Sequence, residues 1–182
     1  MAPAFAHENG ADAHGLVHGL LHPLGGIDHV LAMVAVGVFA ALLGGRAVWR
    51  VPAAFLGMMA LGGVLGATGI TLPMVELGIA LSLIVLGVTL ALRLRMSVAL
   101  AMGLAGFFAV FHGHAHGAEM PELASGLAYG AGFVLSTAGL HAAGLGLGSL
   151  RGRLDAGREF GLVRVAGVLV ALAGAGLLTG VV

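Results

Sequence analysis

The sequence predicts an all-α integral membrane protein, a compact bundle of about six transmembrane helices. Its mean hydropathy is +1.08 and only 9% of its residues are charged, whereas soluble domains carry about 25% charged residues. The 182 residues divide into apolar stretches joined by short loops, and each stretch is close to the roughly 20 residues that cross a bilayer as a helix. Arginines occupy only every second loop, as expected when successive helices cross in opposite directions.

The apolar stretches follow one another without a linker. They cover residues 25–44, 51–69, 73–92, 96–114, 122–147 and 162–182. A tight turn from Gly69 to Pro73 separates the second stretch from the third, and the fifth is long enough to tilt or protrude. Glycine supplies 33 residues, and such small residues let membrane helices approach closely. We therefore expect residues 7–182 to form a single polytopic membrane transport domain.

The arginine positions orient the bundle. The loops after the first, third and fifth stretches hold Arg46 and Arg50, Arg93 and Arg95, and Arg151, Arg153, Arg158 and Arg164. The N-terminal tail, the turn near residue 70 and the segment 113–121 hold none. Because arginine-rich loops remain in the cytoplasm, we expect both termini to lie outside it, in the cytoplasmic (inner) membrane.

The first six residues resemble the end of a secretion signal. Ala4-Phe5-Ala6 has the A-x-A pattern of a cleavage site. Residues 1–6 are therefore predicted to be a signal-peptide remnant, with the mature chain starting near His7 outside the cytoplasm.

Missing residue types exclude several functions. Cysteine is absent, which removes disulfides, thiolate metal sites and cysteine nucleophiles. Lysine is absent too, so the chain has neither a P-loop lysine nor a Schiff-base lysine. The formal net charge is zero, which implies no basic surface for nucleic acid. We expect no ATP hydrolysis and no organic cofactor.

A first polar cluster lies at the start of the first apolar stretch and reads His22-Pro23-Leu24-Gly25-Gly26-Ile27-Asp28-His29. Proline and glycine here predict a broken first helix near Pro23–Gly26, and such breaks at membrane depth line binding cavities. In an uninterrupted helix His18, His22 and His29 would share a face. Asp28 is a candidate ligand, or an acceptor that orients an imidazole. The alternative is a helix-capping histidine with an Asp–His pair that only holds the fold.

A second cluster ends the fourth stretch. His112, His116 and Glu119 are spaced by four and three residues, so one helix face presents them together, and His114 points to the opposite side. Three such ligands suit one metal ion; the alternative is a solvated outer loop. His141, inside the fifth stretch, is either a pathway ligand or a satisfied core histidine. Imidazole and carboxylate without thiolate suit a divalent transition metal, and polar groups at membrane depth indicate function.

These motifs resemble those of the HupE/UreJ family of nickel/cobalt permeases. The first cluster is similar to the family's HPxxGxDH signature, and Phe111 to Glu119 is similar to its FHGxAHGxE stretch. The resemblance extends from about residue 15 to residue 182. It implies that His22, Asp28 and His29 bind the ion from the first helix, and His112, His116 and Glu119 from the fourth. It also implies nickel or cobalt import that supplies hydrogenase or urease maturation, and a cleaved signal peptide.

The function predicted is therefore secondary, non-ATP-driven transport of Ni²⁺ into the cell, with Co²⁺ or Zn²⁺ as other candidate ions, and not enzymatic catalysis. The metal site comprises His22, Asp28, His29, His112, His116, Glu119 and His141. Expected partners are the ion and the lipid bilayer, with a homo-oligomer and nickel-enzyme maturation proteins as further candidates.

Two other functions remain open. An intramembrane zinc-dependent hydrolase would also use His and carboxylate ligands, although the sequence contains neither HExxH nor Gly-x-Ser-Gly. A metal sensor or a partner-dependent membrane subunit is the second.

Overall fold

The computed structural model describes residues 6–120, 125–150 and 156–180, and these ranges contain helices and no strand. The helices are α1 (Ala6–Gly25), α2 (Ile27–Leu43), α3 (Ala47–Ala67), α4 (Val75–Ala91), α5 (Val98–Ala118), α6 (Gly126–Ser149) and α7 (Ala156–Thr179). Helices α2 to α7 correspond to the six apolar stretches in order. The all-α membrane fold predicted from composition is confirmed to this extent.

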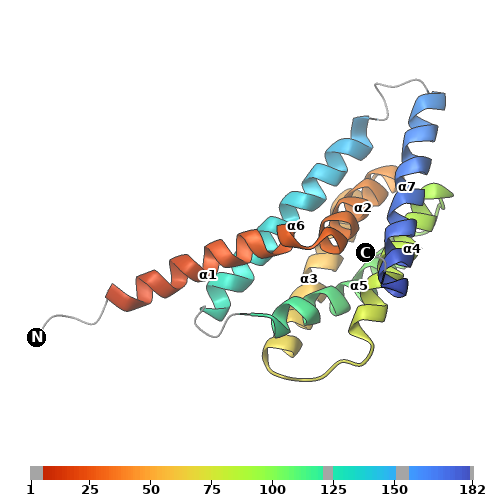
Figure 1. Cartoon of the computed structure of the whole chain (residues 1–182). Coiled ribbons are helices and arrows are strands. Elements are labelled where there is room, and N and C mark those ends of the chain that lie inside the picture. The colour runs from red at the N-terminus through yellow and green to blue at the C-terminus, as the bar shows by residue number, and fades with distance from the viewer. Residues whose placement is uncertain (1–5, 121–124, 151–155, 181–182) are drawn as a thin grey trace, which may run out of the picture.

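Helix α1 was not among the apolar stretches. We expected a tail before the first stretch, but a helix of 20 residues begins at Ala6. Its first half carries His7, Glu8, Asp12 and His14, so hydropathy alone gives no sign of it. Figure 1 shows that α1 leaves the bundle obliquely and that its second half crosses α6. Residues 1–5 of the predicted signal remnant lie outside the described residues.

By their length and composition, the described helices provide four to five candidate membrane spans. Helices α3, α5 and α6 and the segment Gly161–Thr179 of α7 are each long and apolar enough to cross a bilayer. His14–Gly25 and Ile27–Leu43 qualify together as one broken span, bent by 84°. Helix α4 is apolar but has only 17 residues, so it is not counted among these spans. This is why the count is lower than the six spans that we expected. The chain is thus a multi-pass membrane protein, and its sixth span and its orientation stay predictions.

Four helix pairings hold the bundle: α3 packs on α5, α4 on α7, and α6 on both α1 and α2. Glycine makes the pairings close. A Cβ on Gly113 of α5 would collide with the Met59 carbonyl oxygen of α3, and one on Gly19 of α1 with the Tyr129 carbonyl oxygen of α6. The core between them is apolar, with Met33, Phe39, Phe55, Leu83 and Leu86 nearly inaccessible.

Candidate metal site

The break in the first span falls at Gly26. Helix α1 ends at Gly25, α2 begins at Ile27, and Gly26 between them has extended backbone (φ −98°, ψ 116°). The predicted break near Pro23–Gly26 is confirmed. Because the axes diverge by 84°, His22 and His29 do not share one continuous helical face and instead approach α5 from two directions.

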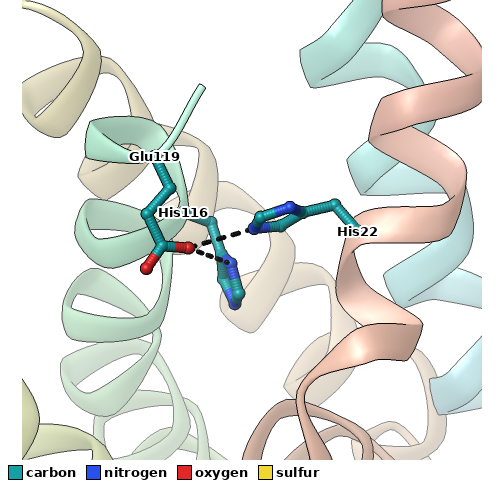
Figure 2. Close-up of side chains that lie close together, drawn as sticks. All are labelled: His22, His116 and Glu119. Atoms are coloured by element: carbon teal, nitrogen blue, oxygen red, sulfur yellow. Dashed lines mark hydrogen bonds and ion pairs between the residues drawn. The ribbon is translucent and has the colours of Figure 1, made fainter. Parts of the chain in front are cut away.

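Three side chains converge where α1 and α5 end. His22 Nε2 lies 3.1 Å from Glu119 Oε2, and His116 Nδ1 lies 3.6 Å from the same oxygen. Figure 2 shows the His22 ring of α1 facing His116 and Glu119 of α5. Each residue offers a ligand atom within 4.8 Å of the other two. Two imidazoles and one carboxylate suit a divalent transition metal, and three protein ligands leave positions for water. We call these residues the outer triad.

The outer triad borders a pocket of about 500 Å³. The polar residues that line it are His18, His22, Asp28, Glu76, His116 and Glu119. Asp28 stands in the first turn of α2, and its Oδ1 lies close over Gly26. Sequence reasoning gave no role to His18 or Glu76. The arginine positions placed both residues near the outer end of the bundle, and this was the sequence feature that could have indicated a role at the site.

A row of buried groups continues inward from His116. His116 Nε2 lies 3.1 Å from His29 Nδ1, and His29 Nε2 lies 3.2 Å from Thr137 Oγ1. His29 is fully buried. The Phe133 ring packs against His22, His29 and His116. Residues from the first and second clusters are therefore in direct contact.

Two further histidines lie deeper. His112 is buried beside His29, with ring centroids 5.6 Å apart, and its Nε2 lies 2.9 Å from Ser82 Oγ. His141 is buried on α6, with Nδ1 2.9 Å from the Met33 carbonyl oxygen. The Phe55 ring contacts both histidines, at centroid distances of 6.2 Å and 5.1 Å. The candidate residues thus form a row from pocket to core rather than one shell.

His114 is turned away from this row. Its Nε2 lies 2.7 Å from the Ile70 carbonyl oxygen, and because a carbonyl only accepts, the imidazole donates. This hydrogen bond ties α5 to the segment between α3 and α4, so His114 has a structural partner on the side opposite His112 and His116.

Comparisons with known proteins agree with the motifs. A family model described as HupE / UreJ protein matches residues 1–177. A relative, Protein HupE from Rhizobium leguminosarum bv. viciae, is 51% identical over 180 residues, which cover 98% of this chain and 92% of the relative. No solved structure matches the chain.

Proposed function

The chain belongs to the HupE/UreJ family, and from this premise we propose that it is a secondary permease that moves Ni²⁺ into the cell, with Co²⁺ as the alternative cargo. The observation that carries the proposal is the convergence of His22, His116 and Glu119 within 4.8 Å beside an open pocket. It is not an enzyme, and the ion supplies hydrogenase or urease maturation.

The proposed path follows the row of polar groups. The cation enters the pocket, where Asp28 and Glu119 attract it, and exchanges water for His22 and His116. It then passes to His29, His112 and His141. Binding along the path must be weak and repeated, because a tight closed site traps the ion. Neighbouring histidines 4.8 to 5.6 Å apart between ring centroids fit such stepwise transfer.

We propose six spans in the cytoplasmic membrane with both termini outside, in one transport domain from residue 7 to 182 that follows a signal remnant of residues 1–6. Helix α4 is the sixth span, since its 17 residues reach about 26 Å and stand at the short limit for crossing. The C-terminal ends of α2 and α4 lie toward one end of the bundle, and the C-terminal ends of α3 and α5 lie toward the other (Figure 1). Arg46 and Arg93 then face the cytoplasm, as the positive-inside rule requires.

The test is Ni²⁺ uptake into proteoliposomes that contain this chain alone, with and without a proton gradient, beside His22→Ala and His29→Ala. We expect saturable uptake in the wild type and none in either variant, both of which remain folded. Gradient dependence reports proton coupling. Full uptake by both variants contradicts the site. Binding without uptake in the wild type favours a sensor, a partner-dependent subunit or a zinc hydrolase, whose open metal position the outer triad also resembles.

A further inference from the structure

His112 carries a bare nitrogen inside the bundle. The Ser82 hydroxyl donates its only proton to the Ile79 carbonyl oxygen at 2.6 Å. Ser82 Oγ must therefore accept from His112 Nε2, 2.9 Å away. With the proton of the neutral ring on Nε2, the lone pair is on Nδ1. This Nδ1 is buried and has no hydrogen-bond partner among the described residues.

His141 repeats the arrangement with the two nitrogens exchanged. Its Nδ1 lies 2.9 Å from the Met33 carbonyl oxygen, which only accepts, so Nδ1 carries the proton. The lone pair is on Nε2, which is also buried and without a partner in the described part of the chain. His141 is 1% exposed and His112 is inaccessible.

Three buried imidazole nitrogens lack a hydrogen-bond partner among the described residues, the third being His116 Nδ1 of the outer triad. They call for an explanation, because buried polar atoms normally find a partner. In metal sites an imidazole donates its N–H to a neighbouring acceptor, which fixes the tautomer and points the other nitrogen at the ion. Ser82 and Met33 hold His112 and His141 in this way, and both rings contact Phe55. Phe55 is itself fully buried.

We propose that His112 Nδ1 and His141 Nε2, whose rings both contact Phe55, form an inner station that selects late transition-metal cations after the outer triad has captured them. This inference rests on the proposed transport function. It adds a second binding step, made of neutral nitrogen ligands, to the carboxylate-containing step at the pocket.

The two steps differ in what they bind. The outer triad includes Glu119, and carboxylate oxygen also suits Mg²⁺ and Ca²⁺. At the inner station the neighbours of the two imidazoles are Phe55, His29, a serine hydroxyl and a backbone carbonyl. Imidazole suits nickel, copper and zinc, whereas Mg²⁺ and Ca²⁺ prefer oxygen. Asp28 acts electrostatically on His112 but lines the outer pocket, and neither inner imidazole is hydrogen-bonded to a carboxylate among the described residues. A magnesium ion is therefore expected to be held less well at the inner station than at the triad.

The test uses His112→Gln and His141→Asn. The Gln amide N–H replaces Nε2 toward Ser82, the Asn amide N–H replaces Nδ1 toward the Met33 carbonyl oxygen, and the bare imidazole nitrogen is lost in each. His114→Gln is the matched control, since its imidazole also donates to a carbonyl but faces away from the row. Ni²⁺ binding to the purified full chain in nanodiscs is measured by equilibrium dialysis with excess Mg²⁺, and uptake in proteoliposomes. We expect each inner variant to lose one bound Ni²⁺ per chain and to slow uptake by about 10- to 100-fold. The control His114→Gln is expected to keep both the bound Ni²⁺ and the wild-type uptake rate.

A second measurement uses the wild-type protein alone, so it does not depend on whether the variants fold. Nitrogen-15 NMR of the wild type reports which nitrogen of each histidine is protonated, and Zn²⁺ serves as a diamagnetic probe. We expect unprotonated His112 Nδ1 and His141 Nε2 signals that shift when Zn²⁺ is added in excess of the outer site. Signals that stay unchanged at saturating Zn²⁺, or inner variants that match the control in bound Ni²⁺, overturn the inner station. A wild type that binds the second ion without uptake contradicts the transport function and leaves the station standing.

Discussion

At the scale of single residues, neighbours decide what each histidine does. His116 reaches Glu119 with Nδ1 and His29 with Nε2. If His116 Nδ1 ligates a cation, its proton must be on Nε2, which then donates to His29 Nδ1, and His29 Nε2 donates to the Thr137 hydroxyl. Capture of the ion at the pocket is thereby connected to a fully buried histidine. His114, two residues away in sequence, is outside this connection because it donates to Ile70.

Glu119→Gln tests the charge in the outer triad. The amide keeps the size of the side chain but removes the negative charge that stabilises a bound cation. We expect Ni²⁺ affinity and uptake at low Ni²⁺ to fall by about tenfold or more, since loss of even a supporting residue has that effect. Proteoliposome uptake at a series of Ni²⁺ concentrations measures this. His14→Ala, an exposed histidine earlier on α1, is the control and keeps the wild-type rate; equal affinity in Glu119→Gln and the control contradicts the ligand role.

Binding should weaken in acid. A protonated imidazole has no lone pair for the metal, and imidazole ordinarily titrates near pH 6.5. Each imidazole ligand that is protonated in the free protein therefore lowers the affinity by about tenfold per pH unit below its own pKa. Equilibrium dialysis with Ni²⁺ between pH 5 and pH 8 measures the slope. An affinity that is unchanged between pH 8 and pH 5 contradicts this prediction.

At the scale of helices, close backbone contacts position the site. Helix α5 holds His112, His116 and Glu119, and it packs so tightly on α3 that Gly62, Gly66, Gly113 and Gly117 all face backbone atoms of the partner helix. Helix α1 holds His22 and meets α6 through Gly19 and Gly132 in the same way. The outer triad forms because both contacts bring their helix ends to the same place.

Gly113→Ala tests the contact between α3 and α5. The added Cβ meets the Met59 carbonyl oxygen, a backbone atom that cannot rotate away. The helices must separate, at a cost of about 1–3 kcal/mol, which corresponds to roughly 2–4 °C of melting temperature per kcal/mol. Gly103→Ala on the same helix is the control, since its Cβ meets nothing within 4 Å. Thermal unfolding in detergent measures both; equal melting temperatures for the two variants contradict the close contact.

At the scale of the whole molecule, the row of histidines is open at one end. The pocket of His22 and Glu119 leads to His29, His112 and His141. Further along α2, buried Met33 and Phe39 fill the interior, and Phe39 borders a second pocket of about 320 Å³ beside Arg93. Under the proposed function, these apolar side chains must separate before an ion reaches the arginine-bearing end.

The orientation of the bundle can be tested by labelling because the chain has no cysteine. Ile70→Cys, between α3 and α4, and Leu92→Cys, after α4, both replace exposed side chains. If the positive-inside rule holds, a membrane-impermeant maleimide labels Ile70→Cys in intact cells and Leu92→Cys only after lysis. The reverse pattern inverts the proposed topology, and labelling of both in intact cells removes α4 as a span.

The sequence by itself determined the membrane class, six of the seven described helices, a helix break near Pro23–Gly26 and the two polar clusters. Hydropathy, proline and glycine positions and charge act locally along the chain, so they can be read without tertiary contacts. Helix α1 was not predicted, because its first half is polar and gives no apolar stretch.

Only the tertiary structure decided how the histidines are distributed. Their spacing permits a single shared shell, but the 84° bend and the glycine contacts place His22 with Glu119 at the pocket, and His112 and His141 against Phe55 in the core. The acceptors that fix the inner tautomers, Ser82 and the Met33 carbonyl, come from other helices. Such contacts depend on how helices cross, which hydropathy and residue spacing do not encode.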